Sequence, residues 1–175
     1  MQYVSSYQSP LGPVTLAGDE AGLAGLWFDG QKYFGSTLAP ERTEGDLPLF
    51  RETRLWLDRF FAGQDPGPRP PLALRGTPFQ LAVWALLLEI PRGGTVTYGQ
   101  LAARLAAAGR RASAQAVGGA VGRNPVSILV PCHRVVGANG SLTGYAGGVG
   151  KKLRLLSLEG AGVSGLSAPG GGAAR

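Results

Sequence analysis

The sequence predicts an α+β / α/β fold with two small domains. The first 72 residues carry three short apolar or β-branched runs separated by turn compositions, which is typical of consecutive strands. Segment 49–61 then places its apolar residues at helical spacing. Capped helical segments follow, so we expect a strand-rich first domain and a mainly helical second domain. The three expected strands are residues 3–7, 14–17 and 23–28.

A linker stiffened by proline separates the two expected domains. Residues 63–71 contain four prolines and two glycines, a composition that keeps a chain extended and free of regular structure. We therefore place a scaffold domain at 1–72 and a second domain at 73–160. The end of the chain, 161–175, is rich in glycine, alanine and serine and cannot bury enough apolar surface to fold, so we expect a disordered tail there.

Two helices of the second domain begin with the same capping signal. Thr77 and Thr97 are each followed three residues later by a glutamine, the pattern in which both side chains bond to the helix start. The first helix runs through 81–88, stops before Pro91 and is apolar all round, so we expect it to be the buried centre of the domain. We expect the second helix to end near Gly109, because glycine is typical of the left-handed position that follows a helix.

A short basic turn and a helix of small residues over 114–121 follow Gly109, which makes a helix-turn-helix candidate. Glycines in a helix interior cost about 1 kcal/mol each. Two explanations of these glycines remain open. Either a partner such as DNA approaches the helix backbone closely, or the helix is short and the glycines lie in a loop. The remaining expected elements are β segments at 126–130 and 134–136, an Asn-Gly turn at 139–140 and a helix at 151–159.

Charge is distributed unevenly along the chain. Residues 1–72 hold six Lys or Arg against nine Asp or Glu, a net charge of −3, whereas residues 73–175 hold eleven against two, a net charge of +9. A basic half of this kind is typical of a protein that binds a polyanion. A generally arginine-rich proteome would give the same balance.

A single cysteine and a single histidine exclude several classes of protein. One cysteine cannot form an internal disulfide, and it cannot complete a closed zinc site with one histidine. The apolar stretches are too short to span a bilayer, and the N-terminus lacks the order of a secretory signal. We therefore expect a soluble, cytoplasmic protein, monomeric in solution, without a metal, a cofactor or a membrane partner.

The strongest chemical signal is the run Pro-Cys-His-Arg at 131–134. A lone cysteine is most often a small buried hydrophobe. A thiolate is nevertheless a good nucleophile, and its population rises beside a base and a positive charge, which His133 and Arg134 would supply to Cys132. In an extended chain His133 would point away from the thiol, so we expect it to act through a water or a bend. A histidine base needs an orienting group, and Glu159 is the only acidic residue after position 89.

At these residues the sequence closely resembles the O6-alkylguanine-DNA alkyltransferases, also called methylated-DNA–protein-cysteine methyltransferases. The signature is Asn-Pro-Val-Ser-Ile-Leu-Val-Pro-Cys-His-Arg-Val-Val at 124–136. The resemblance is strong over 77–160, whereas the first 72 residues are only compatible in size and strand content. Further segments in the family's order are 77–84, 90–91, 97–102, 116–118, 143–148 and 158–160.

The resemblance implies a fold and a reaction. The first domain would be a small ribonuclease H-like scaffold, and the second a winged helix-turn-helix-like alkyltransferase domain. That domain would bind double-stranded DNA containing O6-alkylguanine from the minor groove and rotate the damaged base out of the duplex. Cys132 would take the alkyl group irreversibly and once only, from O6-alkylguanine and also from O4-methylthymine. His133 would deprotonate the thiol through a water, and Glu159 would orient the histidine.

The resemblance also implies roles for residues around the cysteine. Tyr98 would donate a hydrogen bond to the leaving base, and Asn124 would brace the turn behind the thiol. Where the family has a serine after the pocket tyrosine, this chain has Ala146, so one hydroxyl contact would pass to the backbone. The expected base pocket comprises Tyr145, Ala146, Gly147, Val135 and Val121.

A second expected set contacts DNA. Many family members fill the gap left by the rotated base with an arginine, whereas this chain has Gln115, which lacks the charge and the planar cation. Arg104 and Arg134 are further candidates for phosphate contacts, although Arg134 could equally be structural. The expected DNA-binding residues are Gln115, Ala114, Gly118, Ser113, Arg111, Arg123 and Arg110.

Two other functions use part of the same sequence features. Alkyltransferase-like damage sensors bind DNA without reacting, but they lack the acceptor cysteine that this chain has. A cysteine hydrolase could use Cys132 and His133, but it would leave the helix-turn-helix unused and would turn over repeatedly.

Overall fold

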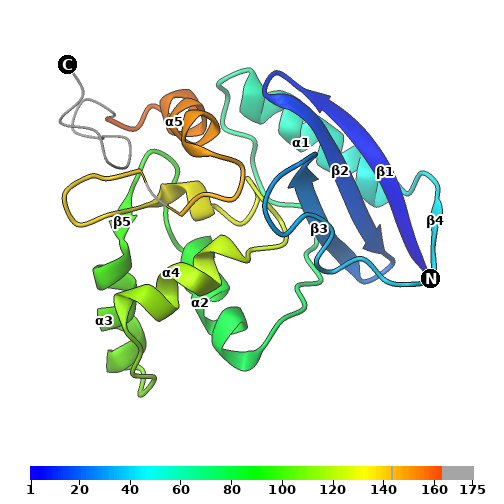
Figure 1. Ribbon diagram of the computed structural model, residues 1–175. Helices are drawn as coiled ribbons and strands as arrows, with labels where there is room; N and C mark the ends of the chain where they lie inside the picture. The colour runs from blue at the N-terminus through cyan, green and yellow to red at the C-terminus, as the bar shows by residue number, and fades with distance from the viewer. Residues whose placement is uncertain (143, 163–175) are drawn as a thin grey trace. The chain divides into compact units, whose positions relative to one another are not determined.

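The computed structural model describes residues 1–142 and 144–162 (Figure 1). The chain forms two compact units. The first consists of Met1–Arg75 and Pro125–Leu129, and the second of Gly76–Asn124 and the chain from Val130 onward. Of the tail expected at 161–175, only positions 161 and 162 belong to the described residues.

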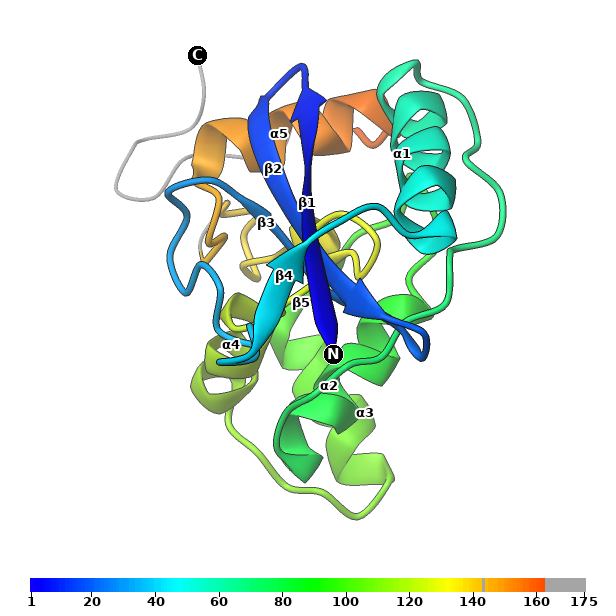
Figure 2. The same ribbon diagram turned by 90° about the vertical axis from the view of Figure 1, so that its right-hand side faces the viewer.

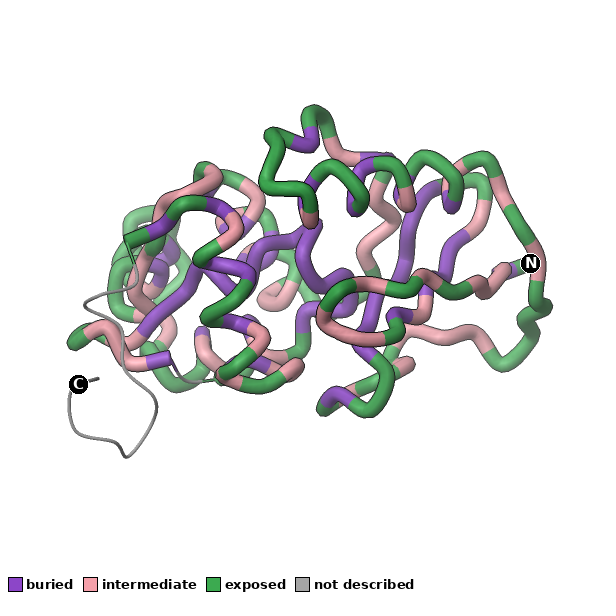
Figure 3. Tube along the Cα trace, turned by 90° about the horizontal axis from the view of Figure 1, so that it is seen from above, coloured by how far each residue is buried: buried purple, intermediate pink, exposed green. Residues whose placement is uncertain are grey.

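The first unit contains a four-stranded sheet of order β3-β2-β1-β4 (Figure 2). Strands β1 (Gln2–Ser9), β2 (Gly12–Asp19) and β3 (Gly22–Phe28) are antiparallel, whereas the short β4 (Arg42–Glu44) runs parallel to β1. The three predicted strands are therefore present, and each is longer than expected. Every residue of β3 is buried (Figure 3).

Helix α1 (Pro48–Phe61) packs against β1 and β2, and it confirms the helix predicted over 49–61. A proline occupies its first turn, where the missing N–H has no intrahelical partner in any case. Its apolar residues recur every three or four positions and form one buried face. The buried residues are Phe50, Thr53, Trp56, Leu57 and Phe60.

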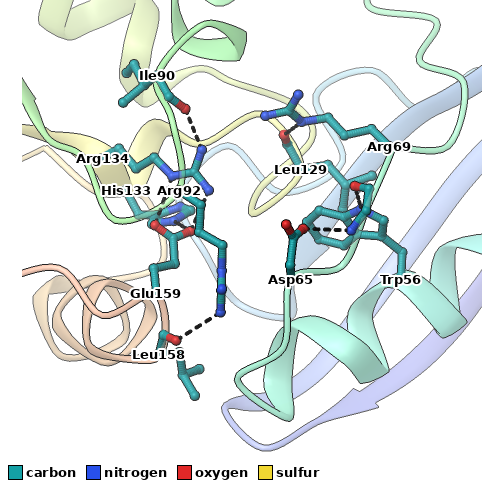
Figure 4. Close-up of polar contacts among 11 residues, drawn as sticks. Trp56, Asp65, Arg69, Ile90, Arg92, Leu129, His133, Arg134, Leu158 and Glu159 are labelled. Carbon is teal, nitrogen blue, oxygen red and sulfur yellow. Dashed lines mark hydrogen bonds and ion pairs between the residues drawn. The ribbon is translucent and has the colours of Figure 1, made fainter.

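The predicted β segment at 126–130 is wrong. Among the residues that the structure describes, this segment forms one isolated bridge, between Val126 and Leu26 of β3. Ile128 has a φ of 72°, a left-handed conformation that ends extended pairing. The Arg69 guanidinium donates a hydrogen bond to the Leu129 carbonyl at 2.7 Å and holds the segment within the first unit (Figure 4).

The second unit is mainly helical. Helices α3 and α4 pack against each other and against α2, which confirms the predicted helix-turn-helix. The short strands β5 and β6 pair in parallel. The elements are α2 (Pro78–Leu88), β5 (Val96–Thr97), α3 (Tyr98–Ala107), α4 (Ala114–Gly122), the 3-10 helix η1 (Cys132–Arg134), β6 (Val135–Val136) and α5 (Val149–Leu158).

Both predicted capping boxes are present. The Thr77 hydroxyl accepts from the Gln80 N–H at 3.1 Å, and the Gln80 side chain accepts from the Thr77 N–H at 3.0 Å. Thr97 and Gln100 make the same pair of bonds at 3.0 and 2.8 Å. Because the second box fixes the start of α3, it also fixes the position of Tyr98, the first residue of that helix.

Helix α2 is buried on one face only, which corrects the prediction of a helix buried all round. Val83, Trp84 and Leu87 are buried, whereas Leu81 is 39% exposed. The buried face meets α4, where the Trp84 indole N–H donates to the Ala120 carbonyl at 2.9 Å. Helix α2 therefore carries apolar residues on its exposed side as well as on the face that packs against α4.

Two features are not found in the described part of the chain. No helix in it combines the length and the apolar character needed to cross a membrane. No three His, Cys, Asp or Glu residues within 1–142 and 144–162 gather as they would around a metal ion.

Candidate active site

Cys132 is the first residue of η1, and all three residues of this turn are buried. The turn is held by backbone bonds from the Cys132 N–H to the Val130 carbonyl at 2.8 Å and from the Arg134 N–H to the Pro131 carbonyl at 3.0 Å. The expectation of an extended chain at Cys132 and His133 is therefore wrong, because a 3-10 turn does not send consecutive side chains to opposite faces. Of the β segment predicted at 134–136, only Val135–Val136 forms a strand.

Asn124 lies just beyond α4 and supports this turn. Its side-chain N–H donates to the Val130 carbonyl at 2.8 Å, and the residue is 4% exposed. The same carbonyl also accepts from the Cys132 N–H, so Asn124 supplies it with a second donor and stabilises the chain immediately before Cys132. The position agrees with the bracing role that the resemblance implies.

Glu159 joins the end of α5 to η1 (Figure 4). His133 Nε2 and Glu159 Oε1 are 2.6 Å apart. Arg134 donates to the same carboxylate twice, from Nε to Oε2 at 2.9 Å and from a terminal nitrogen to Oε1 at 2.8 Å. Its other terminal nitrogen donates to the Ile90 carbonyl at 2.6 Å. The three side chains are 0%, 7% and 0% exposed in the order His133, Arg134, Glu159.

This geometry settles the two readings of Arg134. A guanidinium that is buried and bound in a fork to a carboxylate is structural, so the phosphate contact considered for Arg134 is wrong. Arg92 stabilises the end of α5 beside Glu159. Its guanidinium donates to the Leu158 carbonyl at 3.3 Å, near the negative end of the helix dipole.

The network fixes the charge of its members. Burial alone would raise the pKa of Glu159, but the hydrogen bonds and positive charge of His133 and Arg134 outweigh it and lower the pKa to about 2. Burial lowers the pKa of His133, with the charges of Arg134 and Lys152 adding to it and Glu159 opposing it. His133 is therefore neutral near pH 7. Because an ionised carboxylate only accepts, Nε2 carries the hydrogen and Nδ1 carries the lone pair that can take a proton.

The positive charge that acts on the thiol comes from a residue that the sequence analysis missed. The pKa of Cys132 lies above its ordinary value, because the effect of burial exceeds the lowering by the Asn124 side chain, the charge of Lys152 and two backbone N–H groups. Arg134, expected to supply this charge, is instead bound to Glu159. The sequence contained a signal for Lys152, because it shares one helical face with Leu155 and Glu159 at i, i+3 and i+7.

Tyr98 lies where α3, α4 and α5 meet. The Lys152 ammonium is 6.0 Å from the centre of its ring. A Cβ on Gly118 would meet that ring at 3.6 Å, an ordinary contact. A Cβ on Gly144 would lie 2.7 Å from the Tyr98 hydroxyl, and Gly144 has a φ of 75°, so only glycine fits there.

Three residues of the predicted base pocket are consecutive in one loop. Tyr145 is buried, and Ala146 and Gly147 are half-buried in the loop that follows Gly144, the residue against the Tyr98 hydroxyl. Val135 and Val121 are 0% and 2% exposed, so they pack inside the unit and present no surface to a ligand. Position 143 lies outside the described residues.

The helix-turn-helix presents small and basic residues. The Ser113 hydroxyl caps α4 by accepting from the Ala116 N–H at 3.0 Å. Gly118 and Gly119 lie inside α4, so the alternative that they belong to a loop is wrong. Arg104 makes an exposed ion pair of 3.1 Å with Glu89. The exposed residues of the predicted DNA-binding set are Arg110, Arg111, Ser113, Ala114, Gln115 and Arg123, and Gly118 is half-buried.

Two family models match the chain. The ribonuclease-like domain of 6-O-methylguanine DNA methyltransferase matches residues 2–73, and the DNA binding domain matches residues 78–161. The methylated-DNA–protein-cysteine methyltransferase of Methanosarcina acetivorans is 45% identical over 159 residues, which cover 90% of this chain and 98% of that protein. The protein of the same name from Mycobacterium tuberculosis is 44% identical over 161 residues, or 91% and 93% of the two chains.

Solved structures agree with these matches. The crystal structure of Mycobacterium tuberculosis O6-methylguanine methyltransferase has a TM-score of 0.78 and 43% identity, covering 91% of this chain and 93% of that one. The Mycobacterium tuberculosis protein OGT in complex with DNA gives 0.79 and 43%, with coverage of 90% and 92%. Similarity over nearly the whole length shows that this chain belongs to the methylated-DNA–protein-cysteine methyltransferase family.

Proposed function

We propose that this protein repairs DNA by moving the alkyl group of O6-alkylguanine onto Cys132. The thiolate sulfur attacks the alkyl carbon and forms a sulfur–carbon bond. The bond between that carbon and O6 breaks, and its electron pair stays on the base. Guanine gains one proton, which balances the proton lost by the thiol. The thioether is not reversed by thiol exchange, so each molecule reacts once.

The observation that carries this proposal is the hydrogen-bonded pair of His133 and Glu159 beside the only cysteine of the chain. With Nε2 committed to the carboxylate, Nδ1 is the ring nitrogen that can take the thiol proton through a water. The ionised Glu159 stabilises the imidazolium that forms. Tyr98 would donate its hydroxyl hydrogen to the base as negative charge develops there.

The DNA partner follows from the second unit and its relatives. The O6 atom of a stacked guanine cannot be reached by a buried thiol, so the base must leave the duplex. The small residues of α4 let its backbone approach the minor groove closely, and Gln115 would fill the space that the base leaves. Arg110, Arg111 and Arg123 would contact phosphates, an interaction that weakens as salt rises. The Mycobacterium tuberculosis relative solved with DNA supports this partner.

The same proposal assigns work to the rest of the chain. Residues 1–72 form the scaffold domain, and 73–160 form the domain that binds DNA and accepts the alkyl group. The protein acts as a monomer without a cofactor, in the cytoplasm, where bacterial and archaeal DNA is found. O4-methylthymine is a second substrate of the same displacement reaction.

Mass spectrometry of the intact protein and its peptides tests the proposal. The protein is mixed with excess duplex carrying one O6-methylguanine, and a Cys132→Ser variant serves as control. We expect one methyl group on the Cys132 peptide, one repaired guanine per protein molecule, and no change in the variant. Binding without a mass change would instead indicate a damage sensor, and repeated turnover would indicate a hydrolytic enzyme.

A further inference from the structure

Lys152 is a buried cation to which the proposed reaction has so far assigned no role. It is 0% exposed, whereas Lys151 is half-buried and Leu153 and Arg154 are exposed. Its position in α5 points it to the same side as Leu155 and Leu156, the apolar face of the helix. An ordinary amphipathic helix places leucine or methionine at such a position.

The surroundings of Lys152 belong to the candidate active site. Helix α5 packs against η1, the turn that carries Cys132 and His133. The ammonium is 6.0 Å from the centre of the Tyr98 ring, within the range of a cation–π interaction. Its charge acts on both Cys132 and His133. A single buried side chain of α5 thus lies over the Tyr98 ring, in the helix that packs against the turn carrying the thiol and the base.

Burying an ammonium is unfavourable, because the charged form loses its contact with water. Burial lowers the pKa of Lys152 to about 8, and the negative charge of an ionised Cys132 opposes the shift. An apolar side chain of similar length would fill the site without this penalty. The cation is therefore better explained by what it does for its neighbours than by packing.

We infer that the Lys152 ammonium is the counter-ion of the Cys132 thiolate and that it positions the Tyr98 ring beside the acceptor site. Lys152 acts through these two residues, so it is a positioning residue. The inference deepens the proposed function and rests on it. It also replaces Arg134, whose charge is committed to Glu159, as the source of positive charge for the thiol.

Alkylation then changes the charge balance around Lys152. The sulfur uses a lone pair to form the bond to the alkyl carbon, and the thiolate becomes a neutral thioether. The ammonium stays buried but has lost the negative charge that offset it. Either Lys152 releases its proton more readily, or the contact between α5 and η1 weakens. At pH values where Cys132 is ionised, the reacted protein is therefore less stable than the unreacted one.

A pH profile of the thiol tests the inference without DNA. Iodoacetamide forms a thioether with the thiolate and releases iodide, and mass spectrometry counts the product at the only cysteine. Lys152→Met keeps the length of the side chain and removes its charge, and Lys151→Met on the next position is the matched control. Lys152 and Asn124 act directly on the thiol, and its neighbour His133 is held by Glu159, which also binds Arg134.

We expect Lys152→Met to raise the apparent pKa of Cys132 by about one unit, which slows its alkylation about tenfold near pH 7. Lys151→Met should follow the unaltered protein. Superimposable profiles for Lys152→Met and the unaltered protein would overturn the inference. Methyl transfer from damaged DNA is measured in a separate assay. If that assay shows no transfer, the pH profile with iodoacetamide still tests whether Lys152 lowers the pKa of Cys132.

A second measurement uses the unaltered protein and does not depend on the folding of a variant. Nitrogen-15 spectroscopy of the lysine side chains follows the titration of Lys152 before and after reaction with iodoacetamide. We expect its apparent pKa to start near 8 and to fall once the thiolate is consumed. An unchanged titration after complete alkylation would show that the two groups are not coupled.

Discussion

Helices α1 and α5 are both amphipathic, but they bury different chemistry. The buried face of α1 carries Phe50, Trp56, Leu57 and Phe60, with Thr53 as its single polar member. The Thr53 hydroxyl donates to the Leu49 carbonyl at 2.7 Å, so even this residue is satisfied within its own helix. In α1 every buried contact adds to stability.

The buried face of α5 combines Leu155 and Leu156 with Lys152, and the helix ends on buried Glu159. Glu159 bonds to His133 of η1, and the charge of Lys152 lowers the pKa of Cys132 in the same turn. A helix can thus keep a regular apolar pattern and still place ionised groups where a reaction needs them. The difference teaches that buried charged residues distinguish the helix beside the candidate active site from the helix that only supports the sheet.

Replacing Glu159 should have the largest effect, because two buried partners depend on it. In Glu159→Gln the Arg134 cation loses its counter-ion, and we expect a loss of about 3–5 kcal/mol in the free energy of unfolding. Methyl transfer should slow by roughly a hundredfold, because His133 loses its orienting charge. Urea unfolding and single-turnover transfer measure the two effects. Glu52→Gln, an exposed site in α1, is the control and should change neither.

The pH dependence of stability in acid isolates the contribution of the Glu159 carboxylate from that of the other carboxylates. The pKa of Glu159 is lowered from 4.5 to about 2, so its contribution of about 3 kcal/mol is complete above the unfolded value and is lost as pH falls through the folded value. The unaltered protein should lose stability between about pH 4.5 and 2 more steeply than Glu159→Gln does. Equal acid limbs would mean that the network does not hold the charge described here.

Phe60→Ala tests the contrasting helix. Phe60 is 1% exposed and packs against Trp56 and Phe61 at ring-centre distances of 5.7 and 5.3 Å. Removing the ring should cost about 3–5 kcal/mol of stability. Transfer per folded molecule should stay unchanged, which is the reverse of the pattern at α5. Leu55→Ala, at an exposed position of the same helix, provides the baseline. A matching fall in the transfer rate for Phe60→Ala would remove the contrast between the helices.

The parts of this contrast that could be predicted are those encoded locally. Helix starts at Thr77 and Thr97 were predicted because a capping box is complete within four residues. Glu159 was found by elimination, as the only carboxylate late in the chain. The strand predicted at 126–130 failed because Ile128 adopts a left-handed conformation that its sequence neighbours do not favour.

The roles of the two cations depend on tertiary contacts, which explains why two interpretations of Arg134 stayed open and why Lys152 was missed. Arg134 follows the histidine in sequence, yet its guanidinium turns to a carboxylate 25 positions away. Lys152 is 20 positions from the thiol that it influences, and only the packing of α5 on η1 brings the two together. The position of Lys152 on an apolar helical face was the one signal in the local sequence. That signal predicts that Lys152 is buried, but it does not predict which residue it contacts.

Lys152→Met should be a stabilising substitution. The folded pKa of about 8 lies below the ordinary 10.5, so the unfolded chain holds the proton more tightly and the buried charge destabilises the fold below about pH 8. Removing it should add about 1–3 kcal/mol near pH 7, and the gain should vanish above about pH 10.5. Chemical denaturation of both proteins across this range measures the difference. A loss of stability at every pH would show that the ammonium is fully compensated in the fold.

The smallest effect is expected in α4, where a Cβ on Gly119 would meet no described atom within 4 Å apart from its chain neighbours and its own helix backbone. Gly119→Ala should therefore stabilise the protein by about 1 kcal/mol through helix propensity. Gly150 in α5 is equally open and provides the matched control. If the small surface of α4 exists for close approach to DNA, both alanine variants gain stability but only Gly119→Ala weakens binding to damaged duplex. Equal affinity for the two variants would mean that a methyl group at this point of α4 does not obstruct the DNA.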